Sequence, residues 1–360
     1  MSVSTEELLS SSGPASPRGA NSVRVWLFVI GVMVIAMVLV GGATRLTDSG
    51  LSITEWKPIH GAIPPLNDAE WQEEFEKYKQ IPEYQQINRG MSLAEFQTIY
   101  WWEWGHRLLG RTIGLVFAVP LAIFWFAGRL SGWLKPRLLL LLGLGGLQGL
   151  IGWWMVTSGL AVRTDVSQYR LAVHLTLAFL ILAYTAWLYA CLTPSWSRVT
   201  GEQPRGAVGS WSIALLVLLF IQIFLGGLVA GLDAGLTFNT WPLMDGAFIP
   251  SGLWIMDPGW VNHFENVLTV QFQHRMTAYL LILFVVLTVW RAFAVPSESR
   301  VRGAVVLVLG LTCLQALSGI ITLVLQVPLG WALVHQGLAS LLLVAIIVLV
   351  RLSTGPRQPG

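Results

Sequence analysis

The sequence predicts an all-α polytopic membrane protein in which eight transmembrane helices form two tandem, parallel four-helix bundles related by a pseudo-twofold axis. Composition is the first observation, because 54% of the 360 residues are hydrophobic and only 11% are charged. The second is a set of eight apolar runs, each close to the ~20 residues that a helix needs to cross a bilayer. The third is an internal repeat, which makes the second half of the chain a copy of the first.

The eight apolar runs are each expected to form one spanning helix. They are residues 25–43, 108–128, 138–156, 171–191, 210–230, 276–293, 304–325 and 331–350. The first run has no small-residue cleavage site, so we expect a retained helix rather than a secretory signal. An even number of spans places both termini on the same side of the membrane.

The uneven distribution of Lys and Arg predicts the orientation. The leader 1–24, the tail 351–360 and the loops that follow the second, fourth and sixth apolar runs (the even-numbered loops) are rich in basic residues. The remaining segments are net acidic. Short cytoplasmic loops retain basic residues, so both termini are expected in the cytoplasm. The leader is rich in Ser, Gly and Pro and poor in Arg, which predicts a disordered segment and favours a bacterial inner (plasma) membrane over an organelle.

The repeat divides the chain into an N-terminal unit, 25–192, and a C-terminal unit, 210–350, joined by a cytoplasmic linker, 193–209. Residues 41–51 (GGATRLTDSGL) match residues 226–236 (GGLVAGLDAGL) at a constant offset. With shorter loops further on, the matched pairs are Gln148 and Gln315, Gly152 and Gly319, His106 and His274, and His174 and His335. Units with an even number of helices enter the membrane in the same direction, which predicts parallel copies.

Four histidines, one per helix, are expected to open helices at their outer, periplasmic ends. His106 and His174 belong to the N-terminal unit, and His274 and His335 to the C-terminal unit. A lone histidine near a helix end is commonly a hydrogen-bonding residue, but two in each unit in matching register favour a function. Two neutral imidazoles that face each other across a bundle ligate haem iron from both sides.

Zinc is the alternative metal for these histidines. It normally takes three or four protein ligands, often with Cys or carboxylate, and the units share no matching acidic ligand. Glycines such as Gly152 and Gly226 would let helices and a flat ligand approach closely, although plain helix packing explains them equally. His60 and His263 have no matching histidine and are expected to be loop residues.

The two units differ three residues before the first histidine, where Glu103 corresponds to Gln271. At a spacing of i to i+3, Glu103 shares a helix face with His106. A carboxylic acid can transfer a proton or stabilise developing positive charge, and an amide can do neither. The alternative is a solvated glutamate at the start of a helix. The difference predicts chemistry in the N-terminal unit and a supporting haem in the C-terminal unit.

Arg107 and Arg275 each follow a histidine directly. Their guanidinium groups suit forked hydrogen bonds to porphyrin propionates, and anchoring to lipid phosphate explains them nearly as well. The acidic outer loop 66–96 has a helical pattern around residues 69–79 and is expected to cover the outer surface.

The chain resembles the haem A synthase family, in particular the type found in proteobacteria and mitochondria. The resemblance covers nearly the whole chain and rests on GGATRLTDSGLSITEW (41–56), EWGHR (103–107), LAVH (171–174), GLTFNTWPLMDG (235–246), QHR (273–275) and VHQ (334–336). The paired outer-loop cysteines of Gram-positive relatives are absent from this sequence, so the resemblance implies no loop disulfide.

The resemblance implies an oxidoreductase that converts haem O to haem A for terminal cytochrome oxidases, oxidising the C8 methyl group to a formyl group by successive hydroxylations. It implies a catalytic role for Glu103, substrate haem O at His106 and His174, and a haem b cofactor at His274 and His335, with all four histidines as axial iron ligands. Haem O synthase, an electron-transfer protein, membrane lipid and a second copy of the chain are candidate partners. No nucleic-acid partner is expected.

Two other classes of protein remain as alternatives. A dihaem cytochrome b that carries electrons across the bilayer usually places two histidines on the same helix and haems on opposite sides, and no helix here has two. A transporter with parallel repeats would have ionisable or unwound positions near the middle of the membrane, of which the sequence has few.

Overall fold

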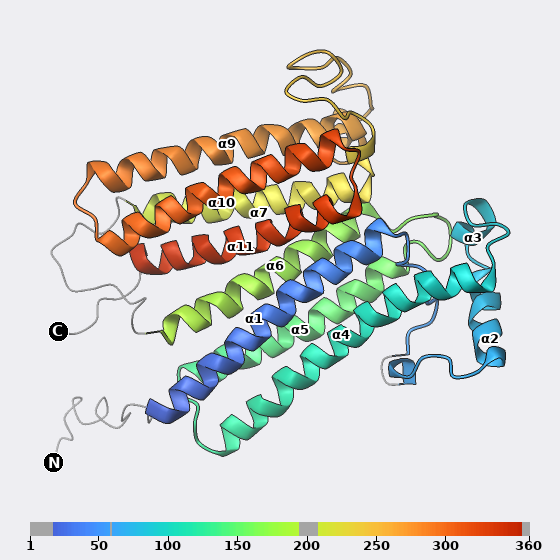
Figure 1. Ribbon diagram of the computed structural model, residues 1–360, viewed down its shortest axis with the longest axis horizontal. Helices are drawn as coiled ribbons and strands as arrows, with labels where there is room; N and C mark the ends of the chain where they lie inside the picture. Colours follow the sequence, from blue (N-terminus) through green and yellow to red (C-terminus); the bar gives the residue numbers. More distant parts are fainter. Residues whose placement is uncertain (1–16, 58–59, 194–207, 355–360) are drawn as a thin grey trace.

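The computed structural model describes residues 17–57, 60–193 and 208–354. Within them, eight helices are long and apolar enough to cross a membrane, which confirms the eight predicted spans. They are α1 (Pro17–Leu46), α4 (Leu93–Phe126), α5 (Leu134–Val156), α6 (Gln168–Cys191), α7 (Gly209–Gly231), α9 (Val267–Ala294), α10 (Ser299–Val324) and α11 (Leu329–Thr354) (Figure 1). The fold is all-α over this part of the chain.

Short helices lie in two long loops at one end of the bundle. The first loop contains α2 (Asp68–Tyr78) and α3 (Pro82–Gln86), and the second contains α8 (Asn262–Glu265) (Figure 1). The predicted helix around residues 69–79 is therefore confirmed. Asn67 caps α2 by accepting a hydrogen bond from the main-chain nitrogen of Glu70.

Several helices extend beyond the apolar runs that predicted them. Helix α4 begins at Leu93, where Ser92 and Glu95 form a capping box, and not near residue 108. Helix α1 begins at Pro17, so residues 17–24 of the predicted disordered leader are helical; proline is favoured at the first position of a helix. The apolar runs mark the membrane crossing and not the helix ends. Residues 1–16, 194–207 and 355–360, which hold the rest of the predicted leader, linker and tail, lie outside the described residues.

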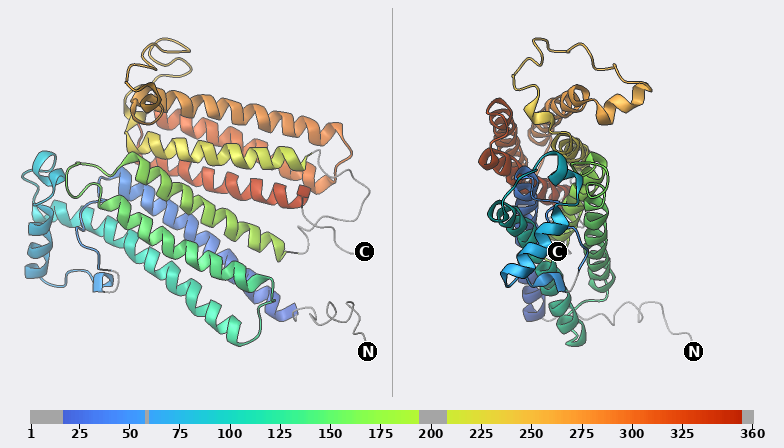
Figure 2. Two further views of the ribbon diagram at one scale, coloured as in Figure 1. Left: turned by 180° about the vertical axis from the view of Figure 1, so that it is seen from behind. Right: turned by 90° about the vertical axis from the view of Figure 1, so that its right-hand side faces the viewer.

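The long helices pack in two groups that correspond to the two halves of the chain (Figures 1 and 2). In the first group α1 contacts α4 and α6, and α5 contacts α4 and α6; in the second α7 contacts α9 and α11, and α10 contacts α9 and α11. Between the groups α6 contacts α7 and α11, and α1 contacts α11. Exchanging the two units maps this set of contacts onto itself, which is consistent with the predicted pseudo-twofold relationship.

The boundary between the units depends on close approach of α6 and α7. A Cβ atom on Gly227 would lie 2.7 Å from Cα of Ala172, and one on Gly231 would lie 2.6 Å from Cα of Gln168. Small residues of this kind let membrane helices pack backbone to backbone, where lipid supplies no hydrophobic driving force. At the opposite end of α7, the hydroxyl of Ser212 lies 2.8 Å from that of Ser353 and joins α7 to α11.

Candidate functional site

The four predicted histidines lie on four different helices, each in the half of its helix nearer the outer loops. His106 is on α4, His174 on α6, His274 on α9 and His335 on α11. The expectation that they open these helices is wrong, most clearly for His106, because the capped start of α4 at Leu93 lies well before it. Each of these histidines is therefore preceded and followed by helical residues, which fix its backbone conformation.

The first histidine of each unit lies against a glycine of the first helix of that unit. A Cβ atom on Gly41 would lie 3.1 Å from Nε2 of His106, and one on Gly226 would lie 3.2 Å from Cε1 of His274. The second histidine has a matching neighbour on the preceding helix. A Cβ atom on Gly152 or Gly319 would lie 2.9 Å or 2.7 Å from Cε1 of His174 or His335, respectively.

These four pairs show that each imidazole packs directly against a glycine, and that a Cβ atom at Gly152 or Gly319 would force the ring to move. The structure thus connects Gly152 and Gly226 with the histidines, where the sequence favoured a flat ligand and plain helix packing equally. The repeat could have revealed this connection, because the glycines and the histidines both occur at matching positions in its two copies.

Three glutamines, for which the sequence suggested no role, contact the imidazoles. The side-chain nitrogen of Gln148 is 3.4 Å from Nε2 of His174, and that of Gln315 is 3.3 Å from Nε2 of His335. Gln222 lies 3.1 Å from Nδ1 of His274. The Oε1 atom of each glutamine is buried without a hydrogen-bond partner. Buried amide oxygens without partners are rare, so they mark polar space beside the histidines.

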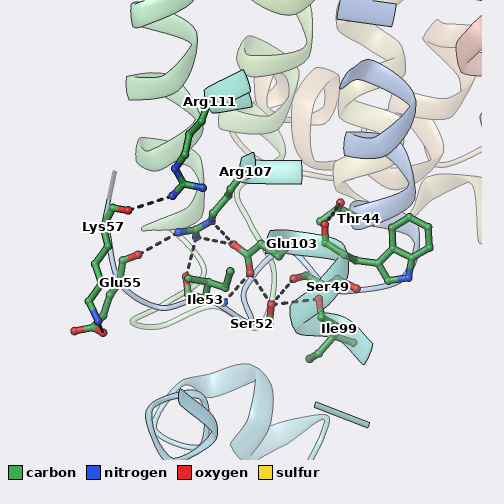
Figure 3. A network of polar contacts seen from close by, with 11 residues as sticks. Thr44, Ser49, Ser52, Ile53, Glu55, Lys57, Ile99, Glu103, Arg107 and Arg111 are labelled. Carbon is green, nitrogen blue, oxygen red and sulfur yellow. Dashed lines mark hydrogen bonds and ion pairs between the residues drawn. The ribbon is translucent and has the colours of Figure 1, made fainter. Parts of the chain in front are cut away.

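Glu103 is only 2% exposed, so the alternative of a solvated glutamate is wrong. Its Oε2 atom accepts hydrogen bonds from Ser52 Oγ at 2.8 Å and from the main-chain nitrogen of Ile53 at 2.7 Å (Figure 3). Its Oε1 atom accepts from Nη2 and Nε of Arg107 at 2.6 and 3.1 Å. The carboxylate is therefore held in one orientation by donors from α4 and from the segment after α1.

Arg107 also fixes that segment, because it donates to the main-chain oxygens of Ile53 at 2.8 Å and Glu55 at 3.1 Å (Figure 3). In the C-terminal unit, Arg275 repeats this arrangement. It donates to the main-chain oxygens of Phe238 at 2.7 Å and Thr240 at 2.9 Å and to Oε1 of Gln271 at 2.9 Å. The repeat matches all of these partners position by position.

Both arginines therefore join the first loop of a unit to its first histidine helix. This structural role was not part of the sequence interpretation. Contact of Arg107 or Arg275 with a porphyrin propionate stays a prediction, and Nε of Arg275 is buried without a partner.

The residues present suit a planar ligand held between two imidazoles. Each unit offers two histidine rings, a glycine beside each ring and polar space lined by amide groups. Among the described residues, no three of His, Cys, Asp and Glu gather into a group that could hold a metal ion by protein ligands alone. The donor set thus fits axial ligation of a haem, where the macrocycle supplies the other four ligands.

Fold and site together define a polytopic helical membrane protein with two repeat-related pairs of histidines, one of which has a buried glutamate on the same helix as its first histidine. The chain belongs to the family of cytochrome oxidase assembly proteins, whose model matches residues 24–347.

Individual relatives are similar over nearly their whole length. The chain is 56% identical to Heme A synthase of Chelativorans sp. over 333 residues, which are 91% of this chain and 90% of the relative. It is 56% identical to Heme A synthase of Brucella anthropi over 329 residues, with the same coverage. With Heme A synthase of Rhizobium meliloti it shares 52% identity over 346 residues, 95% of this chain and 92% of the relative.

Proposed function

We propose that this protein is a haem A synthase, which oxidises the C8 methyl group of haem O to a formyl group by successive hydroxylations and so supplies haem A to terminal cytochrome oxidases. One observation carries the proposal. Two matched pairs of histidines lie in two matched units, and only the N-terminal pair has a buried carboxylate, Glu103, on the same helix. Family membership and the identity to three proteins named Heme A synthase support it.

The N-terminal unit is assigned the substrate, and His106 and His174 would hold haem O through its iron. The C-terminal unit is assigned a haem b cofactor, with His274 and His335 as its ligands. A bound haem iron supplies the one-electron redox chemistry that the oxidation needs. Glu103 is assigned the proton transfer or charge stabilisation at the methyl edge of the substrate, because its position one helical turn before His106 is fixed by four hydrogen bonds.

The asymmetry between Glu103 and Gln271 supports this division of roles. In both units the arginine four residues after Glu103 or Gln271 donates to that side chain and to two main-chain oxygens of the first loop. These oxygens occupy matching positions of the repeat, so the scaffold around the two side chains is alike. Of the two matching side chains only Glu103 is ionisable, and their other contacts differ, because Glu103 accepts from Ser52 and Ile53 whereas Gln271 donates to the main-chain oxygen of Ala234. A conserved scaffold with one altered group is expected when the first copy performs the reaction and the second holds a cofactor.

The excess of Lys and Arg in the even-numbered loops supports cytoplasmic termini, with both haem sites near the periplasmic side of a bacterial plasma membrane. The first residues of α1 and the last residues of α11 lie at one end of the bundle, opposite the long outer loops (Figure 2). Haem O synthase and an electron-transfer protein are proposed as membrane partners, since the substrate must be delivered and the four-electron oxidation of a methyl to a formyl group needs an electron acceptor.

The test is expression of the full-length protein in a bacterium that makes haem O and has no haem A synthase, followed by pigment extraction and chromatography. The wild type should accumulate haem A and purify with haem b. Glu103→Gln should retain its haem and yield no haem A, whereas Gln271→Asn, a change at the matching position, should still yield it. Haem b alone from the wild type would contradict the proposal and favour an electron carrier.

A further inference from the structure

The second histidines of the two units differ in the partners of their Nδ1 atoms. Nδ1 of His335 lies 3.1 Å from the main-chain oxygen of Gln315 and 3.1 Å from the hydroxyl of Ser318. The Ser318 hydroxyl in turn donates to the same oxygen of Gln315 at 2.9 Å. Ser318 is buried, so packing holds this hydroxyl in place.

These contacts determine which ring nitrogen of His335 carries the proton. A main-chain oxygen can only accept, so Nδ1 is the protonated nitrogen, and the lone pair of the neutral ring lies on Nε2. The amide nitrogen of Gln315, 3.3 Å from Nε2, is placed to donate to that lone pair. A histidine that ligates a metal usually donates its other N–H to an oxygen, which fixes the ring and raises its basicity as a ligand. Nε2 of His335 is thus the nitrogen that would hold a haem iron, in place of its contact with Gln315.

His174 lacks this arrangement. Its Nδ1 atom is buried and has no hydrogen-bond partner. The repeat places Ile151 where the C-terminal unit has Ser318, because Gln148 and Gly152 match Gln315 and Gly319. An isoleucine side chain can neither donate nor accept, so nothing at this position selects a tautomer or an orientation of the ring.

We propose that Ser318 is a positioning residue that, with the Gln315 main-chain oxygen, keeps haem b resident in the C-terminal unit, and that Ile151 leaves His174 loosely held so that the N-terminal unit exchanges its haem. The inference rests on the proposed function, since it takes the two haem sites as assigned above. An enzyme that turns one haem into another must release a haem from one site and retain it at the other. His335, whose Nδ1 atom has hydrogen-bond partners, suits the site that retains its haem. His174, whose Nδ1 atom has none, suits the site that releases it.

The first experiment measures haem retention by the C-terminal unit. The full-length protein is purified with its haem, mixed with apomyoglobin as a haem acceptor, and haem b transfer is followed spectroscopically. Ser318→Ala should lose haem b at least tenfold faster, within the roughly 10–100-fold range typical for loss of a group that supports a metal ligand. Its low-spin electron paramagnetic resonance signal should also shift. Ser318→Thr keeps a hydroxyl and should behave like the wild type.

The matched control is Thr312→Val. Thr312 is also buried on α10 and also donates to a main-chain oxygen of its own helix, that of Val308 at 2.8 Å, but it contacts no histidine. Its replacement should leave the transfer rate and the resonance signal unchanged. An equal effect of Thr312→Val and Ser318→Ala would show that helix stability, and not the ring contact, controls haem retention.

The reciprocal variant tests the N-terminal unit; it removes some apolar packing of Ile151 but no hydrogen bond of its side chain. Ile151→Ser should slow release of the N-terminal haem severalfold and leave haem b transfer unchanged. The inference is overturned if Ser318→Ala keeps the wild-type rate and signal, or if Ile151→Ser leaves release of the N-terminal haem unchanged. Should Ser318→Ala fail to fold, the Ile151→Ser result decides alone.

Failure of this inference can be told from failure of the proposed function by His335→Ala. If His335→Ala loses haem b while Ser318→Ala keeps it, only the positioning role is wrong. If His335→Ala retains haem b with an unchanged signal, the assignment of the cofactor to the C-terminal unit is wrong as well.

Discussion

Arg45 of α1 forms an ion pair with Asp233 of the C-terminal unit, with Nη2 and Oδ2 2.7 Å apart. Its other terminal nitrogen, Nη1, pairs with Asp48 at 2.9 Å. Asp48 and Asp233 are matching positions of the repeat, and both have a left-handed backbone with φ of 48°. The match of Arg45 is Ala230, so a single arginine binds both copies of the aspartate and links the two units at the end of the bundle that carries the long loops.

Loss of this link should weaken the contact between the units without unfolding them. Arg45→Gln is expected to lower the free energy of unfolding by about 0.5–1 kcal/mol, because Asp233 is half-exposed and water screens the pair. Added salt should reduce the difference from the wild type. Thermal unfolding in detergent, in a double-mutant cycle with Asp233→Asn, measures the coupling. If the effects of the two single substitutions on the free energy of unfolding add without a remainder, the predicted coupling between Arg45 and Asp233 is contradicted.

Arg107 should matter to the reaction through Glu103. Arg107→Gln removes both donors to Oε1 of Glu103 and the contacts to Ile53 and Glu55, so the carboxylate loses its fixed orientation. We expect a fall in haem A yield of at least tenfold with both haems retained, measured by pigment extraction. Arg275→Gln removes the matching contacts of the C-terminal unit and serves as the control. It should reduce thermal stability but affect the yield less, and equal losses of yield would contradict a special role for Arg107.

A methyl group on Gly319 should displace the ring of His335. The Cβ atom of Gly319→Ala would lie 2.7 Å from Cε1, closer than carbon atoms normally approach, so the imidazole must move. The low-spin b-type absorption should weaken or disappear. Gly310→Ala on the same helix is the control, because a Cβ atom there meets nothing within 4 Å. An unchanged spectrum for Gly319→Ala would show that this ring is not an iron ligand.

Glu83, in the first turn of α3 and outside the membrane-spanning segments, should make the stability of the outer loop depend on pH. Burial, and then the negative charge of Asp48, raise the pKa of Glu83 from its usual 4.5 to about 8. The folded state therefore binds a proton more tightly than the unfolded state, so this contribution to stability is complete below pH ~4.5 and is lost as the pH rises through about 8.

Glu83→Gln, which stays neutral at every pH, should remove that dependence. Its melting temperature should exceed that of the wild type at pH 8.5 and approach it near pH 5, as measured by differential scanning calorimetry. The exposed Glu73→Gln is the control and should not flatten the curve. A wild-type melting temperature that does not fall between pH 5 and pH 8.5 would contradict the raised pKa.

The number of spans was predictable because it depends on local chemistry, and the repeat is visible in the sequence itself. Twenty apolar residues suit a bilayer wherever they occur, and matching motifs reveal duplicated units. Helix boundaries were less predictable, since the capping box at Ser92 extends α4 through a polar segment that hydropathy assigns to a loop.

The surroundings of the candidate site were harder to predict than its members. Burial of Glu103 depends on donors from Ser52 and Ile53, which are distant in sequence and reach it only through packing of the loop after α1. The same holds for the loop contacts of Arg107, which the sequence assigned to a propionate or a lipid. The sequence repeat shows which residues match Glu103 and Arg107, but it does not show which residues these two side chains contact.

The contacts between the units also indicate how the chain arose. Under exchange of the halves, the contact of α6 with α7 becomes that of α11 with α1, and the contact of α6 with α11 becomes itself. This is the pattern of an isologous dimer of a single four-helix chain. Joining the two halves in one chain leaves them free to differ in sequence, as Glu103 and Gln271 do.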